Sequence, residues 1–182
     1  MDYYSQEIVI PKVDENDNVV GSVERWQAHE HGILHSGFTV AVTYKEGLIC
    51  QHRKHPLFDD VLDLTASSHP IVESGNIVPS LDMLYLTLER EWNIKPNDLL
   101  TKPKSIGKVL YKSKDGNYIE HEMCEFFVAA IDYIPQHNPS YAYGQALLTH
   151  HQLRQQINLA PWVTAALNAG LFDPQANLLK TG

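Results

Sequence analysis

One amphipathic helix, set between two groups of strand-like segments, limits the folds open to this chain. Apolar residues of the 81–92 segment recur at i, i+3, i+7 and i+11, which is one face of a 3.6-residue helix. Ser80 precedes this pattern as a suitable N-cap, and Asn93 follows it as a residue that commonly ends helices. The sequence therefore predicts a helix that begins at Ser80 and ends near Asn93.

Strand patterns lie on both sides of this helix. Residues with alternating polarity or β-branched side chains occupy segments 6–13, 36–45, 47–53 and 62–68 before the helix, and 105–113 and 119–132 after it. A Lys-Asp-Gly-Asn turn at 114–117 predicts that the last two strands form a hairpin. Thr149 and Pro161 occupy positions typical of the start of two C-terminal helices. This order indicates an α+β or mixed α/β fold, and we expect one domain over residues 1–182 with a core at about 7–170.

Composition narrows the classes of function. The 182 residues carry Lys+Arg 14 against Asp+Glu 22, a formal net charge of -8, which argues against a nucleic-acid or anionic-membrane surface. No apolar run reaches the roughly 18 residues of a membrane-spanning helix, and no signal peptide is visible. Cys50 and Cys124 are too few for a disulfide framework, so we expect a reduced, cytoplasmic protein, either a monomer or a homodimer.

Three polar clusters, at 28–35, 67–70 and 120–122, contain side chains that could bind a metal or act in catalysis. Of the ten histidines of the chain, the candidate ligands His29 and His35 lie in the first cluster and His69 in the second. Alternate residues of a strand share a face, so Glu120 and Glu122 are expected to project together. Two carboxylates on a buried face need a positive partner, and a divalent metal would supply it. Imidazole together with carboxylate suits manganese or zinc, and magnesium less well. Alternatively, each cluster is a solvated surface.

The clusters belong to an ordered set of motifs. Their sequences are Gly-Ser-Val-Glu-Arg-Trp-Gln-Ala-His at 21–29, Leu-His-Ser-Gly-Phe-Thr at 34–39, Ser-Ser-His-Pro at 67–70 and Glu-His-Glu-Met-Cys at 120–124. In order and spacing this set resembles the type 1 isopentenyl-diphosphate isomerases, a branch of the Nudix superfamily. The resemblance covers about residues 7–170. It implies a Nudix-like α/β/α sandwich, in which a mixed β-sheet is flanked by helices.

The resemblance implies two metal sites. Manganese or zinc would be held by a set of three histidines and two glutamates, namely His29, His35, His69, Glu120 and Glu122. Glu91 matches a carboxylate that helps to hold magnesium against the substrate diphosphate. The other histidines are interpreted as facing away or as surface residues: His31, His52, His55, His121, His137, His150 and His151.

The resemblance also implies roles in catalysis and substrate binding. Glu122 would act as an acid/base group as well as a ligand, and Ser67 stands where the family usually has a cysteine opposite that glutamate. Tyr111 and Trp162 match aromatic residues of the active-site cavity, and the matches to basic residues that contact the diphosphate are Arg25 and Arg53. The family protonates a carbon–carbon double bond and deprotonates a neighbouring carbon, which requires an acid and a base on opposite faces.

Three departures from the family pattern bear on the activity. A serine hydroxyl at position 67 is a far weaker acid than a thiol of pKa about 8.5, and relays a proton only with help from a neighbour. The Nudix box, G-x5-E-x7-R-E-U-x-E-E-x-G-U, keeps only Glu91 of its last glutamates. The 54–63 segment lacks the family's P-G-x-W turn, and an arginine of the box helix is missing, so a diphosphate would meet fewer cations.

Three functions therefore remain open. The first is a metal-dependent isomerase that interconverts isopentenyl and dimethylallyl diphosphate, weakened by Ser67. The second is a Nudix-type hydrolase of a nucleotide or another organic diphosphate. The third is a catalytically inactive family member. The first two share one kind of partner, a small-molecule diphosphate substrate.

Overall fold

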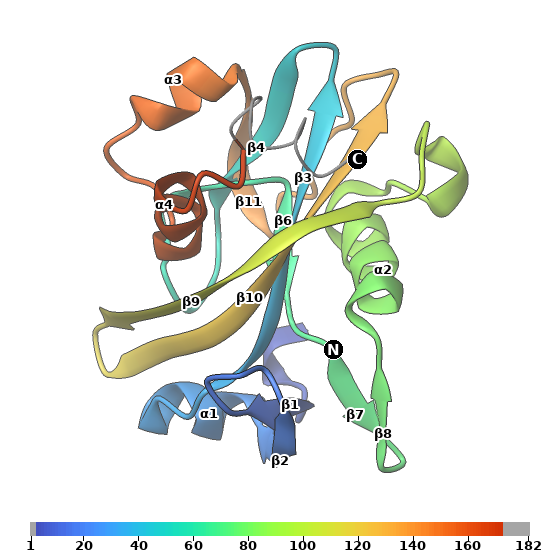
Figure 1. Cartoon of the computed structure of the whole chain (residues 1–182). Coiled ribbons are helices and arrows are strands. Elements are labelled where there is room, and N and C mark those ends of the chain that lie inside the picture. The colour runs from blue at the N-terminus through green and yellow to red at the C-terminus, as the bar shows by residue number, and fades with distance from the viewer. Residues whose placement is uncertain (1–2, 173–182) are drawn as a thin grey trace.

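The computed structural model describes residues 3–172, which form a large mixed β-sheet with helices on both faces (Figure 1). In chain order the elements are the 3-10 helix η1 (Tyr3–Ser5), β1 (Val9–Val13), β2 (Val19–Glu24), α1 (Arg25–His31), β3 (His35–Tyr44), β4 (Gly47–Arg53), β5 (Leu62–Asp63), β6 (Ala66–Ser68), β7 (Ile71–Glu73), β8 (Asn76–Val78), α2 (Ser80–Trp92), the 3-10 helix η2 (Pro96–Asp98), β9 (Lys104–Asp115), β10 (Tyr118–Ile131), β11 (Ala142–Leu148), α3 (His150–Arg154) and α4 (Pro161–Asn168).

The sheet is mixed because β10 runs parallel to β3, whereas the other pairings are antiparallel. The parallel register places Glu122 opposite His35 and continues to Ile131 opposite Tyr44. β9 and β10 form the long hairpin predicted from the turn at 114–117, where Gly116 has a φ of 56°. The parallel pair matters for function because it brings two polar clusters that are far apart in the sequence side by side.

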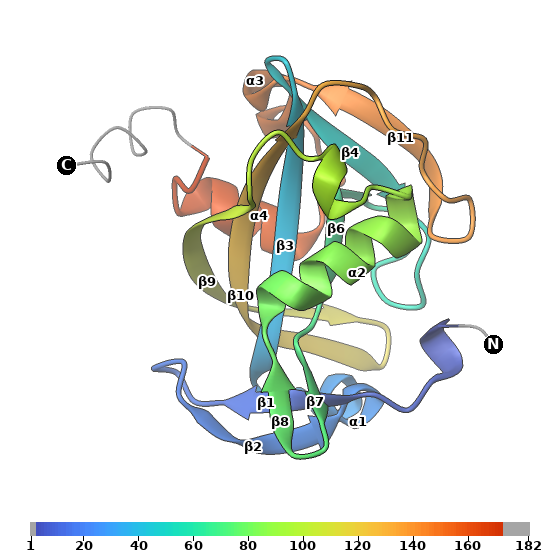
Figure 2. The ribbon, with the colours of Figure 1, turned by 90° about the vertical axis from the view of Figure 1, so that its right-hand side faces the viewer.

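Two hydrophobic cores lie on opposite faces of the sheet, as the side-chain period of two requires. Phe38, Val40 and Val42 of β3 pack on the apolar face of α2, whereas Ala41 and the even-numbered Phe126 of β10 belong to the core beneath α4. Figure 2 shows α2 in front of β3 and α4 on the far side. The predicted mixed sheet flanked by helices, an α/β/α sandwich, is confirmed.

The predicted helix is confirmed as α2, which begins at Ser80 as expected, but its N-cap differs from the expectation. Pro79 is the N-cap, Ser80 is the first helical residue, and no side chain caps the first turn. At the other end Asn93 adopts the left-handed conformation (φ 53°), and its N–H bonds the carbonyls of Leu88 and Glu89. The prediction that Asn93 ends the helix is therefore confirmed, and Ser80 as N-cap is corrected.

Several short elements depart from the sequence-based expectation. The 25–31 segment, which has no long apolar stripe, forms α1, closed by Gly32 at a φ of 60°. The 62–68 segment forms two short strands, β5 and β6, rather than one. The hairpin β7–β8 and the strand β11 were not predicted. The two strands of the hairpin have three residues each, and β11 contains no β-branched residue, so neither gave a strand pattern in the sequence.

The predicted C-terminal helices are confirmed. Thr149 and Gln152 form the capping box of α3, and Pro161 is the first residue of α4. Within residues 3–172, none of the helices combines the length and apolar character needed to cross a membrane.

Candidate active site

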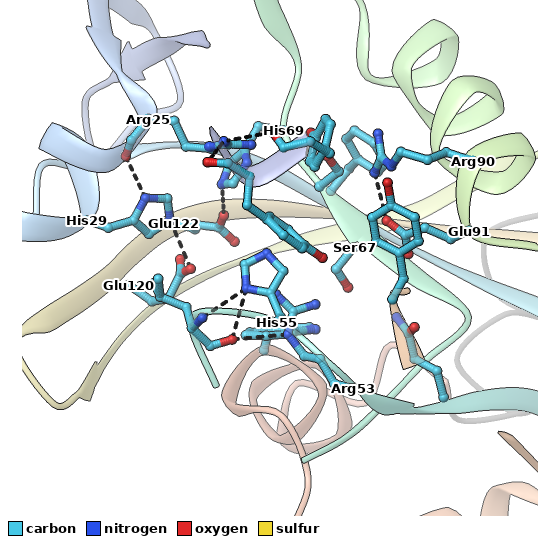
Figure 3. Close-up of a pocket in the computed structure, with 18 of the residues that line it drawn as sticks. Arg25, His29, Arg53, His55, Ser67, His69, Arg90, Glu91, Glu120 and Glu122 are labelled. Atoms are coloured by element: carbon cyan, nitrogen blue, oxygen red, sulfur yellow. Dashed lines mark hydrogen bonds and ion pairs between the residues drawn. The ribbon is translucent and has the colours of Figure 1, made fainter. Parts of the chain in front are cut away.

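A pocket of about 630 Å³, open in part to solvent, lies where the N-terminal segment, β6, α2, β10 and α4 meet. Figure 3 shows His29, Glu120 and Glu122 on one side of it, and Arg90 with Glu91 on the other. All the side chains predicted for the site line this pocket except one, His35, which is fully buried behind it. The tertiary structure thus brings the three polar clusters together.

The five predicted metal ligands form one buried group. The Nε2 atom of His29 lies 3.0 Å from Glu120 Oε1, and Glu122 Oε1 lies 2.9 Å from His69 Nε2 and 3.5 Å from His35 Nε2. One possible ligand nitrogen from each histidine lies within 4.8 Å of the others, and the same holds for His35 with the two carboxylates. These side chains come from α1, β3, the loop after β6, and β10.

The hydrogen bonds of the histidine rings fit a divalent cation. Nδ1 of His29 donates to the carbonyl of Arg25 at 2.6 Å, and Nδ1 of His35 donates to the carbonyl of Ile33 at 2.7 Å. A carbonyl only accepts, so in the neutral rings the Nε2 lone pairs point into the cluster. Nε2 of His35 and of His69 are buried and have no well-aligned hydrogen-bond partner. A cation bound between the rings and the carboxylates would satisfy them.

Strand geometry places the two glutamates, as predicted. Glu120 and Glu122 are both buried on one face of β10, whereas His121 points away and its Nδ1 donates to the carbonyl of Gly32 at 3.0 Å. Gly37 on the adjacent strand leaves room for the carboxylate, because a Cβ there would lie 2.5 Å from Glu122. A side chain at this position would therefore displace the Glu122 carboxylate.

The histidines beside Glu122 influence its protonation. Burial favours the uncharged form of Glu122, but the nearby imidazoles of His35 and His69 outweigh it and hold the pKa of Glu122 well below its usual range. The hydroxyl of Tyr111 donates to Glu122 Oε2 at 2.6 Å. Burial, together with the neighbouring Glu120 and Glu122, raises the pKa of Tyr111 well above its usual value, so this residue stays a donor.

Ser67 forms a different part of the wall. Its hydroxyl donates to Asp63 Oδ2 at 3.0 Å and lies 2.9 Å from Thr39 Oγ1. Cys124 lies behind it, with Sγ 3.5 Å from the same threonine oxygen. Cys124 is buried and does not line the pocket, which agrees with its interpretation as a small core residue rather than a substitute for the family's cysteine. Asp63 was not predicted as a site residue.

Three arginines line the pocket, and Figure 3 shows Arg25 on the side of His29 and Arg90 on the side of Glu91. Arg25 and Arg53 were predicted, and Arg90 joins them, with its Nη2 2.7 Å from Glu91 Oε1. Arg90 stands at a position where the Nudix box has glutamate, so the motif gave no reason to expect an arginine in the site. Only its position on the side of α2 that faces the pocket could have indicated its role. The sequence analysis expected a diphosphate to meet fewer cations than in the family, and Arg90 adds one cation that it did not identify.

The N-terminal segment covers Arg25 and Arg90. Nη2 of Arg25 donates to the carbonyls of Tyr3 (3.4 Å), Tyr4 (3.2 Å) and Gln6 (3.3 Å). The guanidinium of Arg90 lies 3.8 Å from the centre of the Tyr3 ring. No sequence pattern linked these tyrosines to the site, since the contacts join residues more than 20 positions apart.

His55 and Trp162 complete the lining. His55, interpreted from the sequence as a surface residue, lines the pocket against the ring of Tyr4, and burial and the nearby Arg53 lower its pKa well below the usual value. The surface interpretation of His55 is therefore wrong. Trp162 lines the pocket as predicted, with the guanidinium of Arg53 5.0 Å from its ring centre.

Comparisons with known proteins bear on the family and the fold of the chain. No family model matches the chain. Isopentenyl-diphosphate Delta-isomerase 1 of Photorhabdus laumondii is 32% identical over 136 residues, which are 70% of this chain and 71% of that protein. An uncharacterized Nudix hydrolase of Clostridium acetobutylicum is 32% identical over 124 residues, 63% of this chain and 55% of its own length.

Solved structures show the fold. A crystal structure from Deinococcus radiodurans superposes with a TM-score of 0.68 at 18% identity, covering 90% of this chain and 99% of that one. A MutT Nudix hydrolase from Burkholderia pseudomallei superposes with a TM-score of 0.53 at 15% identity, covering 78% and 98%. Fold and sequence together lead to one assignment: the chain belongs to the isopentenyl-diphosphate isomerase branch of the Nudix superfamily.

Proposed function

We propose that the protein is a metal-dependent isomerase of the isopentenyl-diphosphate type, which interconverts isopentenyl and dimethylallyl diphosphate by protonation and deprotonation. The observation that carries the proposal is the convergence of three imidazoles and two carboxylates in a pocket that is also lined by three arginines. A diphosphate would bind the arginines and place its hydrocarbon part against the His/Glu cluster.

The donor set fits two cations. His29, His35, His69, Glu120 and Glu122 would hold manganese or zinc, and Glu91 would help to hold magnesium against the diphosphate. When bound, such cations supply positive charge that positions Glu122 and neutralises the phosphate oxygens.

The side chains that line the pocket would then have different roles in the reaction. Glu122 would move a proton on one side of the ligand, held in place by the Tyr111 hydroxyl. Ser67 would face the ligand from another side, and the indole of Trp162 would favour a carbocation, since its face attracts positive charge. The enclosing tyrosines Tyr3 and Tyr4 would keep water from this cation.

Direct assay tests this proposal. Purified protein with manganese and magnesium is incubated with isopentenyl diphosphate, and proton NMR follows the formation of dimethylallyl diphosphate. We expect slow turnover that Glu122→Gln abolishes. No product at high protein concentration would overturn the isomerase function.

A second candidate, a Nudix-type diphosphate hydrolase, is favoured by the aromatic side chains around the arginines. Tyr4, Trp26 and Tyr141 line the pocket near Arg25 and Arg90, and such rings could stack on a nucleobase. Glu91 is the one box glutamate in position, and Leu86 and Thr87 replace the arginine and first glutamate of the box. Phosphate release from a panel of nucleoside diphosphates distinguishes this function. A blank panel together with a blank isomerase assay would indicate an inactive family member.

A further inference from the structure

A buried carboxylate behind the pocket wall joins three of the side chains that line the pocket. Asp63 is fully buried and does not itself line the pocket. Ser67 Oγ donates to its Oδ2 at 3.0 Å, Trp162 Nε1 donates to its Oδ1 at 2.7 Å, and Arg53 Nη1 donates to Oδ2 at 3.4 Å. All three of these partners line the pocket.

Every group that contacts this carboxylate is a donor. The Leu64 N–H completes the set, with its nitrogen 2.8 Å from Oδ1. An ionised carboxylate is an acceptor only, and the positive charge of Arg53 offsets part of the cost of burying its charge. This arrangement commits the proton of the Ser67 hydroxyl to Asp63.

Because the Ser67 proton is donated to Asp63, the hydroxyl oxygen can only accept further hydrogen bonds. A hydroxyl has one proton and two lone pairs. The proton goes to Asp63, and the Thr39 hydroxyl at 2.9 Å can donate to one lone pair. One lone pair is left for the pocket.

We propose that Asp63 is a positioning residue, which holds the Ser67 hydroxyl so that a lone pair, not the proton, faces the bound ligand, and which fixes the Trp162 indole through the same carboxylate. The part of a ligand that meets Ser67 must then be a hydrogen-bond or proton donor. A thiol at this position would instead offer its own proton. This inference deepens the proposed function, on which it rests for the identity of the ligand.

The first test uses kinetics on the metal-loaded protein. Asp63→Asn keeps the size of the side chain but replaces one acceptor oxygen by an N–H₂ donor. Two of the four contacts are then lost, either the pair on Oδ1 (Trp162 and Leu64) or the pair on Oδ2 (Ser67 and Arg53). We expect kcat for isopentenyl diphosphate to fall by about 10-fold or more, with KM changed less than about 2-fold. In a Ser67→Ala background the same change is expected to have little further effect on kcat, because Asp63 acts through the hydroxyl. Equal losses in both backgrounds would overturn the proposal, and Asp132→Asn, an exposed aspartate, is the matched control.

The second test needs no turnover. In protein labelled with ¹⁵N-tryptophan, the Trp162 Nε1–H signal is assigned with Trp162→Phe. Asp63→Asn is expected to shift this signal upfield, while Asp132→Asn leaves it in place. Ser67→Ala is expected to move it as well, since within residues 3–172 no hydrogen bond links Ser67 directly to Trp162 and both donate to Asp63.

The two arms separate the two proposals. If wild-type protein does not isomerise the substrate, the proposed function fails, but the indole signal still decides whether Asp63 positions the wall. If Asp63→Asn does not fold, the Trp162 Nε1–H signal of Ser67→Ala alone tests whether Asp63 links the two side chains. A Trp162 signal that stays unchanged in Ser67→Ala, and in Asp63→Asn where that variant folds, would overturn the role of Asp63.

Discussion

Two parts of the pocket wall differ in how they are built. The His/Glu cluster contains five side chains that contact one another and carry the residue types of the isomerase family. The Ser67 side instead has a chain of hydrogen bonds from Thr39 through Ser67 to Asp63, where the family pattern has a cysteine. The members of the cluster face one common point, whereas the Ser67 side is a linear series of hydrogen bonds that ends on a carboxylate.

Both parts share one strand as their base. His35, Gly37 and Thr39 alternate on one side of β3: the first belongs to the cluster, the second makes room for Glu122, and the third contacts Ser67. β10 pairs with this strand on one edge and β6 on the other. The difference between the two parts therefore comes from side chains rather than from backbone geometry.

The largest effect is expected when the cluster loses a ligand. Glu120→Ala removes the carboxylate that pairs with His29, so we expect manganese or zinc affinity to fall by at least about 10²-fold. Metal analysis after dialysis measures this loss. Glu125→Ala, an odd-numbered change on the same strand, is the control, and full metal content in Glu120→Ala would contradict the proposed site.

A change on the Ser67 side is expected to have a smaller effect, of opposite sign. Ser67→Cys places a thiol, with pKa about 8.5 in free cysteine, where the family has one, and we expect isomerase turnover to rise about 10-fold or more. Metal content should stay unchanged, because Ser67 is not a ligand in this scheme. Equal or lower turnover, with the metal bound, would show that the surrounding wall no longer supports a thiol.

The contact between the strands offers a finer test. In Gly37→Ala the new Cβ would meet the Glu122 carboxylate at 2.5 Å, and this flexible end must move. Such a displaced side chain costs about 0.5–1.5 kcal/mol, so metal affinity should fall about 2- to 10-fold while the fold persists. Gly144→Ala, where nothing lies within 4 Å of the added Cβ, is the matched control. Unchanged affinity would show that Glu122 is not held in this position.

The smallest effect concerns pH and stability. Burial raises the pKa of Asp63 above its ordinary value of 3.8, with Arg53 opposing the shift. The folded state then binds this proton more tightly than the unfolded state, so the contribution of Asp63 to stability is full below 3.8 and is lost as pH rises through the folded-state pKa.

Urea unfolding of wild type and Asp63→Asn across pH measures this contribution. We expect the free energy of unfolding of wild type, minus that of the variant, to fall as pH rises above about 4. Asp132→Asn should show no such slope. A difference that grows with pH would mean that the contacts of Asp63 lower its pKa instead.

Local sequence patterns were enough to predict the elements whose turn residues or hydrophobic periodicity lie within a few positions. The hairpin at 114–117, the helix ending at Asn93 and the α4 start at Pro161 depend on turn chemistry and periodicity within a few residues. The same reasoning placed Glu120 and Glu122 on one face, since the side-chain period of a strand is two. The three residues of β7 are too few for a periodic signal, and β11 contains no β-branched residue that would indicate a strand.

The sequence by itself determined the ligand types, their order, and the alternation that puts two carboxylates on one side of a strand. Only the tertiary structure decided that β10 lies parallel to β3, that Arg90 and His55 line the same pocket, and that Asp63 lies behind its wall in contact with Ser67. The physical reason is that these contacts join segments tens of residues apart. Their geometry depends on how the sheet and helices pack, and a local pattern carries no record of that packing.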